Sequence, residues 1–187
     1  MYKPLFLITT LLFAISWQLN AQTIFVDPLK GKDTGAGTAT APLATLDKAI
    51  AVTNAFTGKE PVSIKLFPGL YTLTDKLVIR LPAGEEKKGF SIEAVTLPDD
   101  TGWLPTKMPV IQSVSGNNSD AQFPHSVGLL VAADNVKLQG LKFTGNANPT
   151  VKYYYPITKE DSLLTGLAVS QCFFAGDRYS APIQGGV

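Results

Sequence analysis

Apolar and polar side chains alternate with a period of two over most of the chain after residue 61. In the first of these stretches, Val62, Ile64 and Leu66 alternate with Ser63 and Lys65. Such an alternation puts one set of side chains on each face of a β-strand. The stretches are short and are separated by Gly, Pro, Asn or Asp, so we expect a series of brief strands. The later ones are Leu77–Ile79, Phe90–Val95, Val110–Ile111, Gly128–Val131, Val136–Phe143 and Gly166–Phe174.

One stretch upstream of these strands has the pattern of a helix. Thr45 is a suitable N-cap, Asp47 in the first turn favours the positive end of the helix dipole, and apolar residues recur on one side. The pattern predicts a helix from Thr45 to about Ala55. A short strand that stops at Pro28 and a loop rich in Gly, Asp and Thr, Gly31–Ala41, precede it. With a single convincing helix, the chain is predicted to be all-β.

A short pattern of apolar positions recurs near the end of the chain. Val136–Gly145 aligns with Leu167–Gly176 without a gap, and the apolar positions coincide one for one. In both copies two residues replace one at the centre, which predicts a bend between two strands. Stacked coils produce such a recurrence, because each coil packs its inward side chains on those of the next, whereas a β-sandwich has no need of it. The coinciding pairs are Val136 and Leu167, Leu138 and Val169, Leu141 and Cys172, and Phe143 and Phe174; the bends fall at Gln139–Gly140 and Ser170–Gln171; and Asn146–Asp161 is interpreted as a polar, tyrosine-rich insertion.

The N-terminus has the layout of a cleavable secretory signal. Lys3 precedes the apolar run Leu5–Trp17, which is followed by Leu19-Asn20-Ala21. We therefore predict that residues 1–21 are removed and that the mature chain, residues 22–187, is secreted or periplasmic. An uncleaved membrane anchor is the alternative. No later apolar run approaches membrane-spanning length, so no membrane span is expected after removal of the signal.

Charge and cysteine content exclude some classes of function. Without Lys3 the chain has 15 basic and 15 acidic residues, and the absence of a basic patch argues against nucleic-acid binding. Cys172 is the only cysteine, so no disulfide framework exists. Its apolar neighbours favour a packed thiol in a strand over a catalytic pair with His125, the only histidine.

Three motifs occur in order before residue 74: a Gly- and Asp-rich loop, the helix segment Pro42-Leu43-Ala44-Thr45-Leu46, and the turn Pro68-Gly69-Leu70-Tyr71. Together they resemble the N-terminal, DUF1565-like segment of right-handed parallel β-helix proteins of the pectin lyase-like superfamily. The resemblance implies one domain, a single-stranded solenoid with an N-terminal capping helix. The cap would cover residues 22–60 and the coils residues 61–187. Because members of this superfamily usually continue for several more coils, we expect the chain to be truncated at the C-terminus.

The same resemblance implies a carbohydrate-active protein, either a polysaccharide lyase or a glycoside hydrolase, acting on a polysaccharide. Lyases of this architecture use a cationic base and calcium held by acidic residues, so calcium is the metal that the resemblance implies. The residues themselves identify no metal cluster, no cofactor and no catalytic group. Asp99–Asp100 and Asn117–Asp120 have the composition of solvated turns, and Asp134–Asn135 that of a corner between strands.

Candidate binding residues follow from side-chain chemistry. Exposed aromatic rings can stack on sugars, and a charged pair after the second repeat can contact a substrate. Two plainer interpretations compete with these roles: the tyrosines pack the insertion onto the coils, and the charged pair is a local ion pair. The predicted substrate-binding residues are Trp103, Tyr153, Tyr154, Tyr155, Asp177 and Arg178.

Two further hypotheses remain open beside the enzyme. The chain can be a non-catalytic surface β-helix that binds glycans or proteins, or an inactive fragment. A carboxylate pair or an acidic cluster on adjacent coils distinguishes an enzyme from a binding module.

Overall fold

The computed structural model describes residues 22–58, 60–81, 89–119, 125–176 and 178–185. The predicted signal, residues 1–21, lies outside them. The described part is all-β, apart from the helix α1 (Leu46–Asn54) and the short 3-10 helix η1 (Pro105–Lys107). Its strands are β1 (Gln22–Val26), β2 (Val62–Leu66), β3 (Leu70–Leu73), β4 (Leu77–Ile79), β5 (Phe90–Ala94), β6 (Val110–Ser113), β7 (His125–Val131), β8 (Val136–Gln139), β9 (Lys142–Thr144), β10 (Tyr153–Lys159), β11 (Ala168–Ser170) and β12 (Phe173–Ala175).

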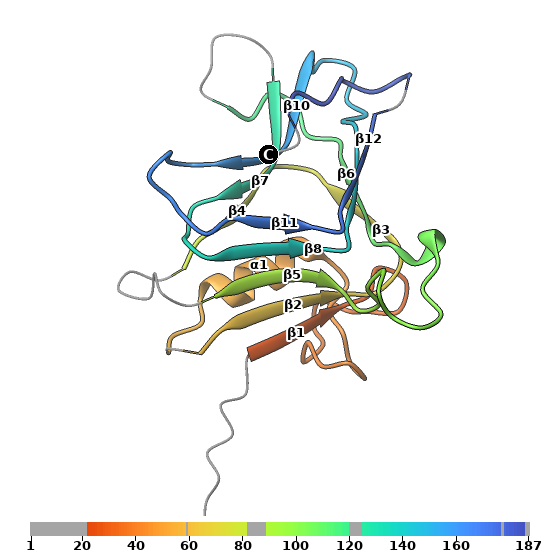
Figure 1. The fold of residues 1–187 in the computed structure, drawn as a ribbon, viewed down its shortest axis with the longest axis vertical. Helices are drawn as coiled ribbons and strands as arrows, with labels where there is room; N and C mark the ends of the chain where they lie inside the picture. The colour runs from red at the N-terminus through yellow and green to blue at the C-terminus, as the bar shows by residue number, and fades with distance from the viewer. Residues whose placement is uncertain (1–21, 59, 82–88, 120–124, 177, 186–187) are drawn as a thin grey trace, which may run out of the picture.

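These strands form three sheets in which every strand pair is parallel. Among the described residues, a five-stranded sheet has the order β1-β2-β5-β8-β11, a four-stranded sheet the order β12-β9-β6-β3, and a three-stranded sheet the order β10-β7-β4. Figure 1 shows the five-stranded sheet facing the viewer, with α1 behind it.

The chain visits the three sheets in a fixed rotation. β2, β3 and β4 enter the five-, four- and three-stranded sheets in turn, and β5, β6 and β7 repeat that order, as do β8, β9 and β10. We call each such passage a circuit; β11 and β12 begin another. Each strand therefore lies beside the equivalent strand of the neighbouring circuit, an arrangement that agrees with a parallel β-helix.

Equivalent apolar side chains stack on one another in the core. In the five-stranded sheet Ile64 pairs with Ile92, which pairs with Leu138, and all three are fully buried. In the four-stranded sheet Phe143 pairs with Phe174, and their rings stack with centroids 5.1 Å apart and planes at 10°. The inward residues predicted from the period of two are thus the residues that fill the core.

The predicted repeat is confirmed by the strand register. Leu138 pairs with Val169 and Phe143 with Phe174, which reproduces the alignment of the two copies. The predicted bends are also present, because Gly140 and Gln171 both have left-handed backbones, with φ of 72° and 53°. A second aligned pair, Asn135 and Gly166, has φ of 56° and 72° and forms the corner before β8 and β11.

The predicted helix is confirmed as α1, and its N-terminus is tied to the preceding loop. The Thr45 hydroxyl accepts a hydrogen bond from the Lys48 amide at 3.2 Å, which caps the helix. The Asp33 carboxylate accepts hydrogen bonds from the amides of Ala44 and Thr45 and from the Thr45 hydroxyl, at 2.9 to 3.0 Å. The buried side of α1 packs against β1 and β4. The loop and helix therefore form one unit over the first circuit.

One expectation was wrong: Asn146–Asp161 is not merely an insertion. It contains β10, which pairs in parallel with β7 over most of its length. The polar residues of this segment obscure the alternation. Pro156 also argues against a strand, since a proline cannot donate a ladder hydrogen bond. The register accommodates it, because no pairing joins Pro156 to the opposite residue, Gly128. Strand β7 likewise begins at His125, upstream of the predicted start.

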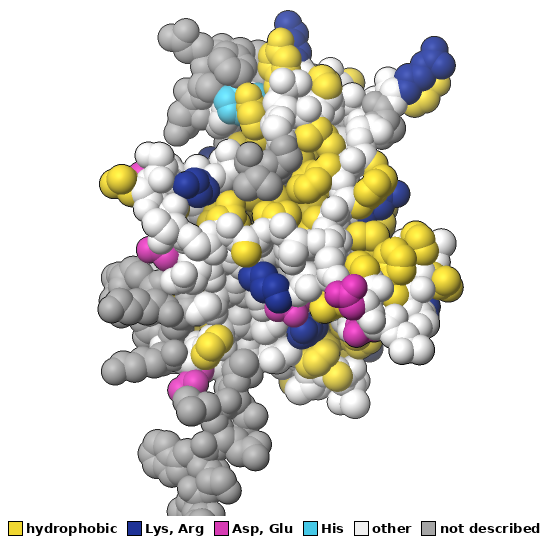
Figure 2. All heavy atoms as spheres, viewed as in Figure 1, with side chains coloured by type: hydrophobic (Ala, Val, Ile, Leu, Met, Phe, Trp, Pro, Cys, Tyr) yellow, Lys and Arg dark blue, Asp and Glu magenta, His cyan; other side chains and the backbone are white. Residues whose placement is uncertain are grey.

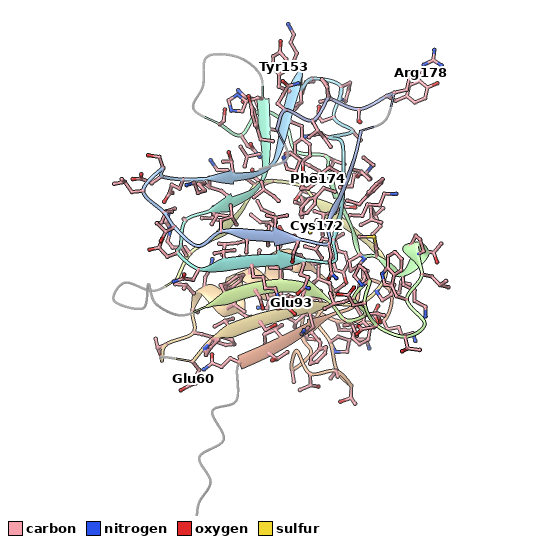
Figure 3. The ribbon with its side chains drawn as sticks, viewed as in Figure 1. Glu60, Glu93, Tyr153, Cys172, Phe174 and Arg178 are labelled. Atoms are coloured by element: carbon pink, nitrogen blue, oxygen red, sulfur yellow. The ribbon has the colours of Figure 1, made fainter. Side chains whose placement is uncertain are left out.

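The outer face of the five-stranded sheet carries a charge ladder across three strands. Glu93 on β5 bonds to Lys65 on β2 at 2.6 Å and lies 3.8 Å from Lys137 on β8. Figure 2 shows basic and acidic side chains beside one another on this face, and Figure 3 labels Glu93. The Glu93 side chain is only 14% exposed, so its charge is compensated by these lysines rather than by water.

Glu93 should make stability depend on pH. Burial alone would raise its pKa, but hydrogen bonds from Lys65 and Ser91 and the charges of Lys65 and Lys137 outweigh burial and hold the pKa below its usual value. Such a carboxyl stabilises the fold above its unfolded pKa of about 4.3, and the contribution disappears as pH falls through the lower folded pKa. We expect Glu93→Gln to lower the melting temperature at neutral pH and this difference to shrink below about pH 4.

The matched control for this measurement is Glu160→Gln. Glu160 bonds to Arg80 at the same 2.6 Å, but the two side chains are 43% and 54% exposed, so water already screens the pair. The melting temperature of the Glu160→Gln variant should stay close to that of the unmodified protein. A Glu93→Gln difference that is constant between pH 3 and pH 7 would contradict the charge-ladder argument.

Candidate functional site

A polar pocket of about 370 Å³ lies against β7 and β10, the strands of the three-stranded sheet that carry seven residues each. Its walls come from these two strands, from the loop before β7 and from the residue that precedes β4. We call it the histidine pocket. It is lined by Lys76, Asn118, Ser119, His125, Val127, Leu130, Tyr155, Thr158, Lys159 and Glu160.

His125 begins β7 and is 9% exposed. Its ring meets the Tyr155 ring edge to face, with centroids 5.4 Å apart and an interplanar angle of 75°. The Ser119 hydroxyl lies 3.1 Å from Nδ1 of His125, within hydrogen-bond distance. Packing on one side and a hydroxyl on the other hold the imidazole at the pocket wall.

Asn118 is fixed in the wall by hydrogen bonds from both ends of its amide. Its Nδ2 donates to the Val127 carbonyl at 3.1 Å, and its Oδ1 accepts from the Val127 amide at 2.8 Å. The Nδ2 also lies 3.3 Å from the Ser115 hydroxyl and from Asp75. The expectation of a solvated turn at Asn117–Asp120 is therefore wrong at Asn118, which joins the loop to β7. Asp120 lies outside the described residues.

A buried polar network supports Asn118 from inside the fold. The Ser115 hydroxyl hydrogen-bonds to those of Ser113 and Ser126, and Asn146 donates to the Ser113 hydroxyl and the Ser115 carbonyl. Ser113, Ser126 and Asn146 are fully buried. A buried network whose members bond to one another is rigid, because breaking any link leaves a desolvated polar group. The network therefore holds the loop that carries Asn118 and Ser119.

Charged groups surround the mouth of the histidine pocket. Lys159 at the end of β10 donates to the carbonyls of Ser162 and Leu164 at 3.2 and 3.0 Å, which anchors its ammonium. Lys76 lies just before β4, and Glu160 bonds to Arg80. Two lysines and one partly neutralised carboxylate give the lining a positive balance.

The three predicted tyrosines have different environments. Tyr155 lines the histidine pocket, and Tyr153 pairs with His125 across the strands and is 40% exposed. Tyr154 is fully buried against Val151 and Ala181, so its ring offers no face to a sugar. For Tyr154 the competing interpretation applies: it packs its own segment against the rest of the fold.

Trp103 lines a second, mostly apolar pocket, also of about 370 Å³. Its other walls include Phe173, which is 56% exposed, and Cys172. The Trp103 indole nitrogen is buried and has no hydrogen-bond partner among the described residues. Burial raises the pKa of the Cys172 thiol, which supports the prediction of a packed cysteine. The two pockets share no lining residue, so Trp103 and the tyrosines form separate surfaces.

Of the charged pair predicted after the second repeat, Arg178 lines neither pocket. Asp177 lies outside the described residues. The Arg178 guanidinium is 5.9 Å from the centre of the neighbouring Tyr179 ring. Figure 3 shows Arg178 at the tip of a loop, far from Cys172 and Phe174.

Apart from Tyr155, none of the residues that line the histidine pocket was predicted as a binding residue, and those missed include Lys76, Ser119 and His125. The sequence does contain a signal for His125, since it is the only histidine, but a catalytic pair with Cys172 is the only role that its sequence context suggests. Its neighbour across the sheet, Tyr153, lies a full circuit later in the sequence, and that relation becomes visible only once β7 and β10 are paired.

The described residues contain neither a cluster of metal-binding side chains nor a membrane-spanning helix. Across the described ranges there is no group of three or more His, Cys, Asp or Glu side chains that could hold a metal ion. The helices within those ranges are too short or too polar to cross a membrane.

Comparison with known proteins gives one family match. A family model described as "Protein of unknown function (DUF1565)" matches residues 29–171. Neither the curated proteins nor the solved structures include a significant match.

Proposed function

Because this chain belongs to the DUF1565 family, whose function is unknown, we propose its function from the site itself: it binds an acidic polysaccharide at the histidine pocket. The observation that carries the proposal is the combination, in one pocket, of the Tyr155 ring with Lys76, Lys159 and the Thr158 hydroxyl.

Each part of the pocket suits a different part of a sugar. Aromatic rings provide a flat apolar surface for the C–H face of a pyranose. The Thr158 hydroxyl matches a sugar hydroxyl, since it can donate and accept a hydrogen bond. The lysine ammonium groups favour carboxylate or sulfate substituents, which distinguish acidic from neutral polysaccharides.

The fold and the predicted secretory signal give this proposal its setting. We propose that the three parallel sheets are a right-handed parallel β-helix of the pectin lyase-like kind, capped by α1, and that the protein is secreted or periplasmic after removal of residues 1–21. A secreted or periplasmic protein has access to extracellular polysaccharides. Lyase or glycoside hydrolase activity and simple glycan binding share this setting, and the histidine pocket by itself supports binding.

The test is affinity electrophoresis through gels that contain polygalacturonate, alginate, chondroitin sulfate or a neutral glucan. We expect retardation by at least one acidic polymer and none by the glucan. Tyr155→Ala should weaken binding roughly 10-fold, the order of one stacked aromatic ring. Lys76→Ala should also weaken binding, and this loss should be larger at low ionic strength, where salt screens ionic contacts least.

Two variants serve as matched controls. Tyr179→Ala removes a tyrosine that is 86% exposed and lines neither pocket, and Lys30→Ala removes an exposed lysine from the loop after β1. Both should bind like the unmodified chain. Equal weakening by the pocket variants and the control variants, or retardation by the neutral glucan alone, would overturn the proposal. Release of unsaturated or reducing ends from a retained polymer would add lyase or hydrolase activity to binding.

A further inference from the structure

The Ser119–His125 contact is a feature of the histidine pocket that saccharide binding does not use. The serine oxygen and Nδ1 of the imidazole lie 3.1 Å apart, and both side chains line the pocket. A serine hydroxyl beside a neutral imidazole is the usual arrangement for activating a serine as a nucleophile. Ser119 Oγ is therefore placed to react with a group bound in the pocket.

We propose that Ser119 and His125 form a catalytic pair that hydrolyses acyl esters, the substrate being an O-acylated form of the bound polysaccharide. The proposal rests on the proposed function for its substrate, because the pocket has to hold the sugar that carries the ester. The chemistry itself depends only on the serine and histidine.

The reaction proceeds in two balanced steps. Ser119 Oγ forms a bond to the ester carbonyl carbon and gives its proton to Nδ1 of His125; the bond from carbon to the sugar oxygen then breaks, and that oxygen takes the proton and leaves as a sugar hydroxyl. Water next attacks the acyl-serine, giving a proton to His125. The bond to Ser119 breaks, its oxygen regains the proton, and the carboxylic acid departs.

The surroundings of the pair position both groups. The edge contact with Tyr155 fixes the plane of the imidazole, and Asn118, held by Val127 and Ser115, anchors the chain immediately before Ser119. Lys76 gives the pocket a positive charge that favours the oxyanion formed on the carbonyl oxygen. A nucleophile, a base and a positive group thus share one pocket.

The first measurement is covalent labelling of the whole protein with a fluorophosphonate, in which the serine oxygen bonds to phosphorus and fluoride leaves. We expect peptide mapping to place the label on Ser119. Ser119→Ala should abolish it, and His125→Gln should slow it roughly 100-fold, the contribution of a general base. Ser170→Ala, on β11 in another sheet, is the matched serine control and should label at the unmodified rate.

Labelling of the unmodified protein tests the catalytic pair even if a variant folds poorly. Absence of label on Ser119, or an unchanged rate in a His125→Gln variant with an unchanged melting temperature, overturns the catalytic pair. Acetate release from an O-acetylated acidic polysaccharide then tests the substrate. If the deacetylated polymer binds but Ser119 does not label, the proposed function stands and the catalytic pair is wrong; if Ser119 labels and neither polymer binds, the proposed function is wrong.

Discussion

Phe143→Ala should destabilise the protein by about 3–5 kcal/mol, the usual cost of truncating a fully buried phenylalanine. The ring of Phe143 is completely shielded from solvent, and it lies between Ile111 of the preceding circuit and Phe174 of the following one. Its removal leaves a cavity between stacked circuits that the parallel ladders on both sides prevent from collapsing. Urea denaturation followed by near-ultraviolet circular dichroism measures the loss.

Phe174→Ala is the matched comparison, because its ring is only partly buried. We expect a smaller loss, roughly 1–2 kcal/mol, since part of that ring already contacts water. The double variant should lose less than the sum of the two, by the roughly 0.5–1.5 kcal/mol of the ring-to-ring contact. Equal losses for both single variants would contradict the view that circuits pack inward on one shared core.

Gly128→Ala should produce the second large loss, about 1–3 kcal/mol from overpacking. A Cβ at this position would lie 2.5 Å from the Tyr154 hydroxyl oxygen and 2.7 Å from the Pro156 carbonyl oxygen. Tyr154 is fully buried, and Pro156 belongs to β10, so neither neighbour can move without disturbing the pairing of β7 with β10. The melting temperature and the affinity for polysaccharide should both fall, because the same strands carry Tyr155 and His125.

Adding Tyr154→Phe to Gly128→Ala should restore part of the stability. The second change removes the hydroxyl that meets the new methyl group, but the contact with the Pro156 carbonyl remains, so the rescue should be incomplete. Gly176→Ala is the control glycine, since no heavy atom of the described residues, its chain neighbours aside, lies within 4 Å of a Cβ built there. A Gly128→Ala protein as stable as the Gly176→Ala protein would refute the steric argument.

The period-two stretches and the aligned repeat predicted the part of the fold that depends on local pattern. Inward residues such as Leu138 and Phe143 recur because each must pack on its equivalent in the next circuit. Both copies of the repeat therefore show the same apolar positions. The bend at Gly140 and Gln171 was visible for the same reason. The helix was predictable because its N-cap bond is local: the Thr45 hydroxyl accepts from the amide of Lys48, three residues later.

The three-stranded sheet was harder to predict, because its strands lack a clean alternation. In β7 nearly every residue is buried, and β10 contains Pro156 and three consecutive tyrosines. What makes β10 a strand is its pairing with β7, a non-local interaction that leaves no period in the sequence. The interpretation of Asn146–Asp161 as an insertion failed for that reason.

The histidine pocket could be predicted only in part. Tyr155 was named from its chemistry, but His125, Ser119 and Lys76 come from three separate segments that adjoin only after the circuits are stacked. Tyr154 has the same chemistry as Tyr155 and is its neighbour, yet it points into the fold. Residue type identified which side chains can bind a sugar, and only the packing decided which of them face the solvent.

The parallel pairing of circuits also bears on how the chain acquires its structure. Val62 pairs with Phe90 and Leu77 with Leu129, partners that are distant in the sequence, so refolding from a denatured state must close long loops and should be slow. During synthesis the order is favourable, because β5, β8 and β11 each emerge after the strand on which they add. Because α1 and β1 are synthesised first, each later circuit can pair with a circuit that has already folded. The protein can therefore fold from its N-terminus while it is being synthesised.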